Sequence, residues 1–389
     1  MNQPTPVPSR YVDTAEALHE LTARLHGASR VAIDTEADSL HSYYEKVCLI
    51  QLAAEGEAYI VDPLAGLDPS GLLEVMAAKP LLFHGADYDL RMLRASLGFR
   101  PQGEVHDTMV AAQVVGFEEF GLASLAQRFC GVTLTKSSRK ADWSLRPLTP
   151  AQLAYAADDV RYLSAIADAL IEEVRRLGRY HWYRESCERM VEATARDRSR
   201  DPENAWRIKG LKGISRQQLA FVRELWRWRE SEAQSADRPP FMVLGNAQLR
   251  DLAVWAAAHP TASLADGPRL PRNCRGSRLH ALERSIEHAR QVPRSEWPQT
   301  RPGPQPSRPA GGPKQAVDTL MAECARIAAD LGLAPPLLAS RATLEAIVAR
   351  LPRSANEILA CSPMLPWQVE LLAPAILKIL ATEPAKERE

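Results

Sequence analysis

The sequence is poor in cysteine and in long apolar runs, and each shortage argues against a class of protein. Six cysteines lie scattered along 389 residues without a CxxC pair, which indicates free thiols in a reducing cytoplasm and no zinc site. No run approaches the ~20 apolar residues that a membrane-spanning helix needs. Residues 1–10 are polar and proline-rich and lack the apolar segment of a secretory signal. We therefore expect a cytoplasmic protein without a membrane partner.

A phosphate-binding loop is also missing, because the chain has no Gly-Lys dipeptide and hence no GxxxxGK[ST] motif. A helicase built on such a loop is excluded. The formal net charge is zero, yet residues 1–100 hold 14 Asp and Glu against 8 Lys and Arg, and residues 198–230 hold 9 Lys and Arg against 4 Asp and Glu. Either these stretches are ordinary solvated surface, or an acidic catalytic module is joined to a basic module that holds phosphates.

The length predicts two or three domains, and the sequence pattern divides them. Residues 10–190 combine strand-like apolar runs with helical spacing, which predicts a mixed α/β domain. Strand signals nearly vanish after residue 206, so residues 206–291 and 315–383 are expected to form two small helical bundles, similar enough in size to suggest a diverged repeat. Residues 292–314 hold seven prolines and three glycines, which predicts a flexible or extended linker.

The first domain offers clear element signals. Strands are expected in residues 30–37, 47–54, 58–62 and 81–84, and helices in residues 13–25, 72–78 and 122–130 and from Asp87 or Tyr88 onward. Thr149-Pro150-Ala151-Gln152 is a strong helix start, and this helix is expected to run to about Leu177 and stop at Gly178. Ser215 and Asn246 are expected to cap two helices further along the chain.

Asp34 and Glu36 stand two residues apart on the first of these strands, so both side chains lie on one face. A strand otherwise made of Val31 and Ile33 would not bury paired acids for stability. The competing interpretation is an acidic strand end that simply faces solvent.

Another pair of acids opens the helix that follows the strand at residues 81–84. Asp87 is well placed to cap this helix through backbone N–H groups, which leaves Asp89 in the first turn. The helix dipole favours a carboxylate there, so a purely structural role for Asp89 competes with a catalytic one.

Tyr155 and Asp159 are four residues apart on the helix that starts after Thr149, so they share one face. Asp158 is adjacent and is easily confused with Asp159. A phenol one turn from a metal-bound carboxylate could orient an attacking water, and with a usual pKa of about 10 it suits that task better than general-base work. Alternatively, all three are surface residues of an amphipathic helix.

The loop before that helix combines three cations with an aromatic ring, at Lys136, Arg139, Lys140 and Trp143. Cations for phosphates and a ring for stacking a base would suit a single-stranded 3′ end. In the alternative interpretation the loop is solvated and Trp143 pins it to the domain.

Together these motifs place four carboxylates, Asp34, Glu36, Asp89 and Asp159, where a two-metal nuclease needs them. Carboxylates that converge on one point repel each other unless cations lie between them. Hard oxygen ligands suit Mg²⁺ or Mn²⁺. Two such ions about 3.5–4 Å apart can activate a water and stabilise the leaving oxygen of a phosphodiester.

Taken in order, the motifs resemble the three Exo motifs of the DEDD superfamily of 3′–5′ exonucleases. The spacing Tyr155-x₃-Asp159 matches the tyrosine subclass, since the histidine subclass would want histidine where this chain has Ala154. Residues 138–148 and 155–163 closely resemble the ribonuclease D family. Two C-terminal segments resemble HRDC domains, which are helical nucleic-acid-binding modules. Pro239-Pro240-Phe241 and residues 244–252 carry the first match, and the second begins after Lys314.

The resemblance implies a ribonuclease H-like mixed sheet followed by two HRDC-like all-α bundles. It implies that Asp34, Glu36 and Asp159 ligate one divalent ion, Mg²⁺ or Mn²⁺. Asp34 would bridge to a second ion, supported through water by Asp89, and Tyr155 would position the attacking water. The substrate would be RNA with a free 3′ end, with tRNA precursors foremost, trimmed to nucleoside 5′-monophosphates by a monomeric enzyme. Substrate contacts are expected at Lys136, Arg139, Lys140 and Trp143.

Two other functions stay open at this point. The same chemistry could act on DNA, because the sequence does not show what would read a 2′-OH. The chain could also be a catalytically weak nucleic-acid-binding protein, although loss of an Exo carboxylate would mark that case and all four are present.

Overall fold

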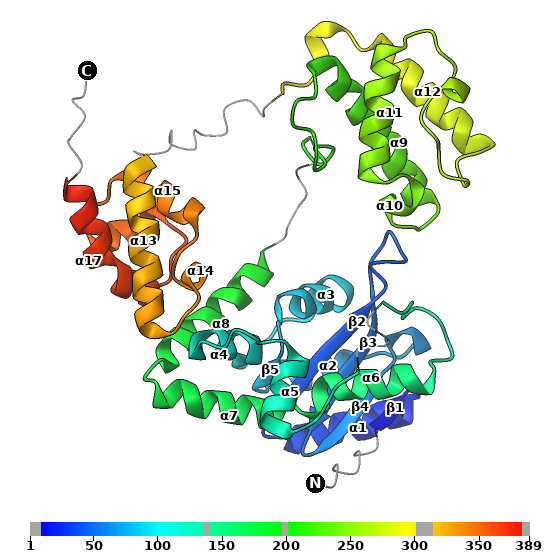
Figure 1. Ribbon diagram of the computed structural model, residues 1–389. Coiled ribbons are helices and arrows are strands. Elements are labelled where there is room, and N and C mark those ends of the chain that lie inside the picture. Colours follow the sequence, from blue (N-terminus) through cyan, green and yellow to red (C-terminus); the bar gives the residue numbers. More distant parts are fainter. Residues whose placement is uncertain are drawn as a thin grey trace. The chain divides into compact units, whose positions relative to one another are not determined.

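The computed structural model describes residues 9–135, 138, 140–196, 201, 203–300 and 314–382. The described chain divides into two compact units (Figure 1). One unit contains residues 9–37, 47–196 and 314–382, and the other contains residues 38–46, 201 and 203–300. The sheet and its helices belong to the first unit.

A six-stranded mixed sheet forms the centre of the first unit, with the strand order β1-β4-β3-β2-β5-β6. The central strands β2, β3 and β4 pair antiparallel, whereas β1, β5 and β6 each join in parallel. All eight residues of β3 are buried, because both faces of the sheet are covered. The strands are β1 (Ser9–Val12), β2 (Val31–Ala37), β3 (Val47–Ala54), β4 (Glu57–Val61), β5 (Leu81–Phe83) and β6 (Val105–Asp107).

Helices cover this sheet on both sides, and the mixed α/β domain expected from the sequence is present. One face carries α1 (Ala15–Gly27), α2 (Ser70–Ala77) and α3 (Asp87–Leu97). The other face carries α6 (Pro150–Arg161) and the start of α7 (Leu163–Arg176). The short helix η1 (Pro63–Ala65) and the helices α4 (Thr108–Val115), α5 (Leu122–Cys130) and α8 (Tyr180–Ala195) complete the domain.

The four expected strands are present to within one residue of their predicted bounds. The single helix expected from Thr149 to Leu177 is wrong, because the chain breaks at Tyr162 into α6 and α7. The break lets α7 pack in two directions: Leu163 contacts the sheet, while Leu170 joins a second core with α4 and α5. The elements β1, β6, α4 and α8 are additions that the sequence patterns did not predict.

The last helices share this second core with the α/β domain (Figure 1). Trp367 is 1% exposed, and its ring stacks on Trp182 of α8 with 5.0 Å between centroids. Gly116 lies so close to Gly332 that a Cβ atom at position 116 would be 2.0 Å from the Gly332 carbonyl oxygen. The helices are α13 (Lys314–Leu331), α14 (Pro335–Leu338), α15 (Arg341–Arg350), α16 (Ala355–Cys361) and α17 (Pro366–Thr382).

Among the described residues, no single helix has both the length and the apolarity to cross a membrane. One bent pair, Ala355–Cys361 with Pro366–Ala381, passes that test by length and composition only, and its two helices meet at 118°. Ile358 and Ile376 of this pair are fully buried in the core shared with the α/β domain.

The second unit is a helical bundle with its own core. It contains α9 (Arg216–Ser235), α10 (Pro240–Val243), α11 (Asn246–Ala258) and α12 (Ser277–Gln291), with the short helices η2 (Leu264–Asp266) and η3 (Arg294–Glu296). Ser215 caps α9 as expected, whereas Asn246 is the first residue of α11 and Gly245 takes the capping position. The loop at residues 38–46 belongs to this unit, since the Asp237 carboxylate accepts the backbone N–H groups of Tyr43 and Tyr44.

The two helical segments repeat one pattern. In each, a long helix leads to a four-residue helix that starts at a proline, Pro240 in α10 and Pro335 in α14, and then to a third helix. The turns before these short helices also correspond, because Asp237 and Gly332 both have positive φ angles. The two segments are therefore alike in the order of their helices and in the turn before the short helix.

Candidate active site

The strand β2 brings two carboxylates to the face of the sheet that α6 covers. Asp34 and Glu36 are both half-buried there, as their spacing predicted. A carboxylate oxygen from each and one from Asp159 all lie within 4.8 Å of one another. Side chains separated by more than a hundred positions in the sequence thus converge in a cluster with the dimensions of a cation site.

The helix α6 supplies Asp159. A capping box fixes the residue at which the helix begins, and small side chains on its buried face let it approach the sheet. Thr149 and Gln152 form the predicted capping box, with Pro150 in the first turn. The buried face contains Ala156 and Ala157, whose small side chains let the helix lie close to the sheet. Tyr155 and Asp159 are one turn apart and reach the same cluster, since the charges of Asp159, Glu36 and Asp34 all act on the phenol.

The neighbouring acid of α6 has a different partner. Asp158 accepts a hydrogen bond from Arg161 at 2.7 Å, one turn further along the helix. It is not among the three carboxylates that converge. The structure therefore separates Asp158 from Asp159, which the sequence alone could not do.

Asp89 is buried and is attached to the strand that carries Asp34 and Glu36. Its Oδ1 accepts the backbone N–H of Thr35 at 3.1 Å and the Thr35 hydroxyl at 2.5 Å. The strand β5 pairs with β2 only at Val31 and Ala32, so the Thr35 N–H lies beyond the end of β5 and needs another acceptor. The carboxylate of Asp89 takes that place and lies near enough to Asp34 to repel its charge.

The expectation that Asp87 caps α3 is wrong. The capping position is Ala86, and Asp87 pairs with Arg91 one turn along the helix at 2.9 Å. The acceptor for this turn comes instead from β6: the Asp107 carboxylate accepts the N–H groups of Gly85 at 3.1 Å and of Ala86 at 2.8 Å. The Asp107 side chain thus fixes the turn before α3, and the direction of α3 places Asp89 at the site.

Asp107 also caps its own helix, because it accepts the N–H groups of Met109 and Val110. The sequence held a signal for this second role, since Asp107 and Thr108 precede an apolar run in the manner of a helix start. The sequence held no signal for the hydrogen bonds from Gly85 and Ala86 to Asp107, because these bonds depend on the pairing of β5 with β6.

The electrostatics of the cluster favour a cation. Burial, followed by the negative charges of Asp89, Asp159 and Glu36, raises the pKa of Asp34 well above its usual value. Burial also raises the pKa of Asp89 to about 6, although the hydrogen bonds from Thr35 oppose the shift. Burial and the three nearest carboxylates raise the pKa of Tyr155, so its phenol stays protonated at neutral pH. A set of carboxylate oxygens that resist ionisation together fits a hard divalent ion.

The predicted substrate residues fare differently from one another. Lys136 and Arg139 lie outside the described residues, and Lys140 is exposed. Trp143 is only 1% exposed, and its ring packs against Tyr155 with 6.0 Å between centroids and 34° between planes. A buried ring is not open to a nucleotide base, so its position fits the interpretation in which Trp143 pins the loop to the domain.

Arg146 anchors the same loop and was given no role from the sequence. Its guanidinium donates to both Asp62 oxygens, at 2.5 and 2.7 Å, and to the Cys48 carbonyl at 3.0 Å. It also donates to the carbonyl of Trp143 at 2.8 Å. Tyr11 donates a further hydrogen bond to Asp62. Through these contacts Arg146 links Trp143 to Cys48 in β3 and to Asp62, which follows β4.

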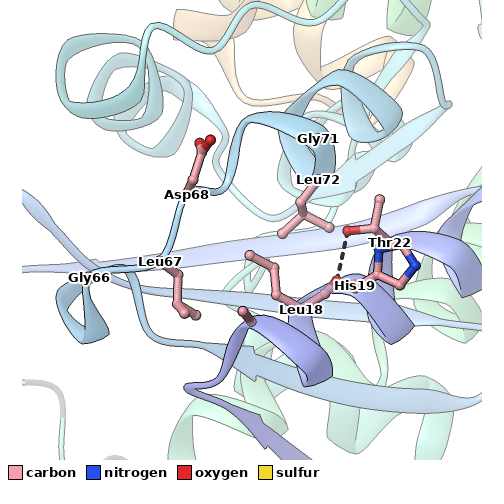
Figure 2. Close-up of a pocket in the computed structure, with 9 residues that line it drawn as sticks. Leu18, His19, Thr22, Gly66, Leu67, Asp68, Gly71 and Leu72 are labelled. Atoms are coloured by element: carbon pink, nitrogen blue, oxygen red, sulfur yellow. Dashed lines mark hydrogen bonds between the residues drawn. The ribbon is translucent and has the colours of Figure 1, made fainter.

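A separate groove lies between α1 and α2 (Figure 2). These helices cover the face of the sheet opposite to α6. Leu18, Leu67 and Leu72 line it with His19, and the Thr22 hydroxyl donates to the Leu18 carbonyl at 2.8 Å. Asp68 is the one carboxylate among its described lining residues, so this groove does not bring several acids together as the α6 face does.

Comparison with known proteins agrees with this geometry. A family model described as 3′–5′ exonuclease matches residues 9–175, and a model of the HRDC domain matches residues 218–257 and 314–380. Ribonuclease D of Acidiphilium cryptum is 33% identical over 386 residues, which cover 95% of this chain and 92% of that protein.

Solved structures give the same assignment. The crystal structure of Escherichia coli RNase D, described as an exoribonuclease involved in structured RNA processing, has 25% identity and a TM-score of 0.70 and covers 97% of this chain and 100% of that one. The catalytic core of RRP6 from Trypanosoma brucei has 25% identity and a TM-score of 0.62 and covers 73% of this chain and 80% of that one. The predicted resemblance and the ribonuclease H-like fold are confirmed, and the chain belongs to the ribonuclease D family of 3′–5′ exonucleases.

Proposed function

We propose that this exoribonuclease trims the 3′ ends of structured RNAs, tRNA precursors foremost, and releases nucleoside 5′-monophosphates with the help of two divalent ions. The observation that carries the proposal is the convergence of carboxylate oxygens from Asp34, Glu36 and Asp159 within 4.8 Å. Asp89, fixed to Thr35, supplies the fourth carboxylate. Mg²⁺ and Mn²⁺ are the ions that this donor set suits.

The carboxylates and Tyr155 have different tasks in this proposal: the carboxylates bind the ions, and the phenol orients the water. Asp34, Glu36 and Asp159 would hold one divalent ion, and Asp34 and Asp89 would hold a second. When bound, such ions act as Lewis acids for the attacking water and for the leaving oxygen of the phosphodiester. Tyr155 stays protonated at neutral pH because its pKa is raised, so its phenol orients the water and does not act as a base.

The proposed substrate has support from outside the site. A relative that covers this chain almost completely is described as an exoribonuclease involved in structured RNA processing. Matches to the HRDC model at residues 218–257 and 314–380 support a nucleic-acid-binding role for the helical segments. We further propose that the protein acts as a monomer in the cytoplasm, and light scattering after size-exclusion chromatography tests the first of these points.

A timed digest tests the proposal. The substrate is 5′-labelled RNA with a short unpaired 3′ tail, incubated with Mg²⁺ or with EDTA, beside a copy whose 3′ end is blocked and a DNA copy of the same sequence. The proposal expects a ladder that shortens from the 3′ end in Mg²⁺ alone and is absent from the blocked copy. Cleavage of the blocked copy would contradict it, and faster digestion of DNA would contradict the RNA substrate.

The natural RNA needs a second comparison. A tRNA precursor with a 3′ trailer is compared with an unstructured RNA of the same length, and kcat/KM is measured for each. A higher value for the precursor is expected if the helical segments bind the folded part of the substrate. Equal values would leave the chemistry in place and remove the tRNA specificity.

A further inference from the structure

Gln51, at the centre of β3, is fully buried with none of its surface exposed. Within the described part of the chain, neither the oxygen nor the nitrogen of its side-chain amide has a hydrogen-bond partner. A buried polar group without a partner destabilises a fold, and an apolar side chain of similar size would avoid that effect. Stability of the fold therefore does not account for a glutamine at position 51.

The register of the sheet places Gln51 directly opposite Asp34 of β2 and Ile60 of β4, with β2 beside β3 in Figure 1. Opposite residues in an antiparallel pair share a face, with Cβ atoms about 4.5–5.5 Å apart. The neighbours of Gln51 along β3, Ile50 and Leu52, belong to the core on the other face. Ile60 offers no polar atom, so Asp34 is the polar side chain directly across the ladder from the amide.

The face that Gln51 shares is the one where the catalytic groups converge. It is covered by α6 and by Trp143. The indole Nε1 of Trp143 is also buried without a hydrogen-bond partner in the described residues. Unpartnered polar atoms thus gather beside the carboxylate cluster, and an amide there can both donate and accept hydrogen bonds.

We propose that Gln51 is a positioning residue for the metal site: its amide N–H donates a hydrogen bond to the Asp34 carboxylate when divalent ions are bound. The inference rests on the proposed two-ion function. Carboxylates that ligate metals are held in place by hydrogen bonds from groups behind them, and loss of such a partner lowers metal affinity about 10–100-fold. Asp34 would be a ligand of both ions, so its orientation matters to both. Gln51 is the side chain that the sheet places across from it.

The test compares Gln51→Met and Gln51→Leu with the wild type and with Leu52→Met. Leu52 is the adjacent residue of β3, fully buried and in the core of the opposite face, which makes it a matched control for a volume-conserving change in this strand. Mn²⁺ affinity is measured by electron paramagnetic resonance of the free ion. The melting temperature is measured in EDTA, and kcat is measured on the labelled RNA.

The expected result is a split between stability and metal binding. Both Gln51 variants melt at the same or a higher temperature than the wild type in EDTA, yet bind Mn²⁺ about 10-fold more weakly, with a lower kcat. Leu52→Met keeps the Mn²⁺ affinity of the wild type. Rescue of kcat in the Gln51 variants at high Mn²⁺ is expected, because the ligands themselves are intact.

Two outcomes would overturn the inference. Unchanged Mn²⁺ affinity with a higher melting temperature would mean that Gln51 only fills space. A lower melting temperature in EDTA, or failure to fold, would mean that the amide already has stabilising partners in the metal-free protein. The wild type separates these results from the proposed function, because absence of Mn²⁺ binding by the wild type would refute the metal site itself.

Discussion

Asp89 of α3 accepts two hydrogen bonds from Thr35, the residue that separates Asp34 from Glu36 on β2. The contact joins two acidic motifs that are 54 positions apart, and it uses the strand residue whose side chain points away from the other carboxylates. A single residue thus sets the spacing between Asp89 and the cluster, which makes Thr35 a sensitive place to test the site.

Thr35→Val removes the hydroxyl that bonds Asp89 and preserves both the shape of the side chain and the backbone N–H. A hydrogen bond to a charged group contributes about 1.5–3 kcal/mol, so we expect kcat to fall about 10-fold or more. Thr22→Val is the matched control, since that hydroxyl donates to the backbone carbonyl of Leu18 within α1. Equal activity of the two variants would show that the Thr35 hydroxyl does not orient Asp89.

Asp107→Asn tests the turn that carries α3. Oδ2 accepts the N–H of Ala86, and Oδ1 accepts those of Met109 and Val110. An asparagine keeps one acceptor oxygen, so the variant cannot satisfy both sets, and loss of the Ala86 bond loosens the start of α3. We expect a loss of stability of about 1–3 kcal/mol together with weaker Mn²⁺ binding that high Mn²⁺ partly restores.

The control for this change is Thr14→Ala, which removes the cap of α1 in the same domain but away from the carboxylates. It should cost about 1 kcal/mol of stability without altering Mn²⁺ affinity. If Asp107→Asn lowers stability but binds Mn²⁺ like the wild type, the turn does not position Asp89.

The pH dependence of the metal-free protein follows from the raised pKa of Asp89. In the folded state this carboxyl has a pKa of about 6, above its value in the unfolded chain, so the folded state holds the proton more tightly. Its contribution to stability is present at low pH and is lost as the pH rises through about 6. We therefore expect Asp89→Asn in EDTA to gain in melting temperature relative to the wild type as the pH increases over this range.

The raised pKa of Asp34 acts in the same direction. Saturating Mg²⁺ should abolish the relative gain, because the ion needs ionised carboxylates and binds the wild type more tightly as the pH rises. Thermal melts from below pH 5 to pH 8, with EDTA or Mg²⁺, measure both effects. A constant difference between the variant and the wild type across this range in EDTA would contradict the assignment.

Trp367→Ala tests the packing of the last helices on the α/β domain. The side chain is almost fully buried and stacks on Trp182, so its truncation should remove about 3–5 kcal/mol of stability. Because the core is shared, we expect the melting of the nuclease domain itself to shift. Leu351→Ala is the control, since Leu351 is 54% exposed in the same segment. A nuclease domain that melts as before would show that the last helices fold separately.

Local patterns in the sequence predicted what depends on neighbouring residues. Alternation along β2 places Asp34 and Glu36 on one face, and the four-residue spacing on α6 joins Tyr155 to Asp159. The capping boxes at Thr149 and Ser215 were equally readable, because each uses residues within one turn.

Contacts between residues far apart in the sequence could not be predicted, because they depend on the fold and not on neighbouring residues. The bonds of Asp107 to the turn before α3 depend on two three-residue strands that are too short to show a pattern. The loop that carries Trp143 is held by Arg146, which donates to the Trp143 carbonyl and to Asp62, 84 positions away in the sequence. Gln51 looks like any strand residue until the register sets it opposite Asp34.

The central claim is that the carboxylates on β2, α3 and α6 hold the divalent ions of the reaction. Crystals soaked in Mn²⁺ test it most directly, through anomalous scattering from the ion in the wild type and in Asp34→Asn. We expect one peak between Asp34, Glu36 and Asp159 and a second beside Asp34 toward Asp89, with both lost or weakened in the variant. A wild-type map without a peak at this cluster, under conditions where the enzyme degrades RNA, would contradict it.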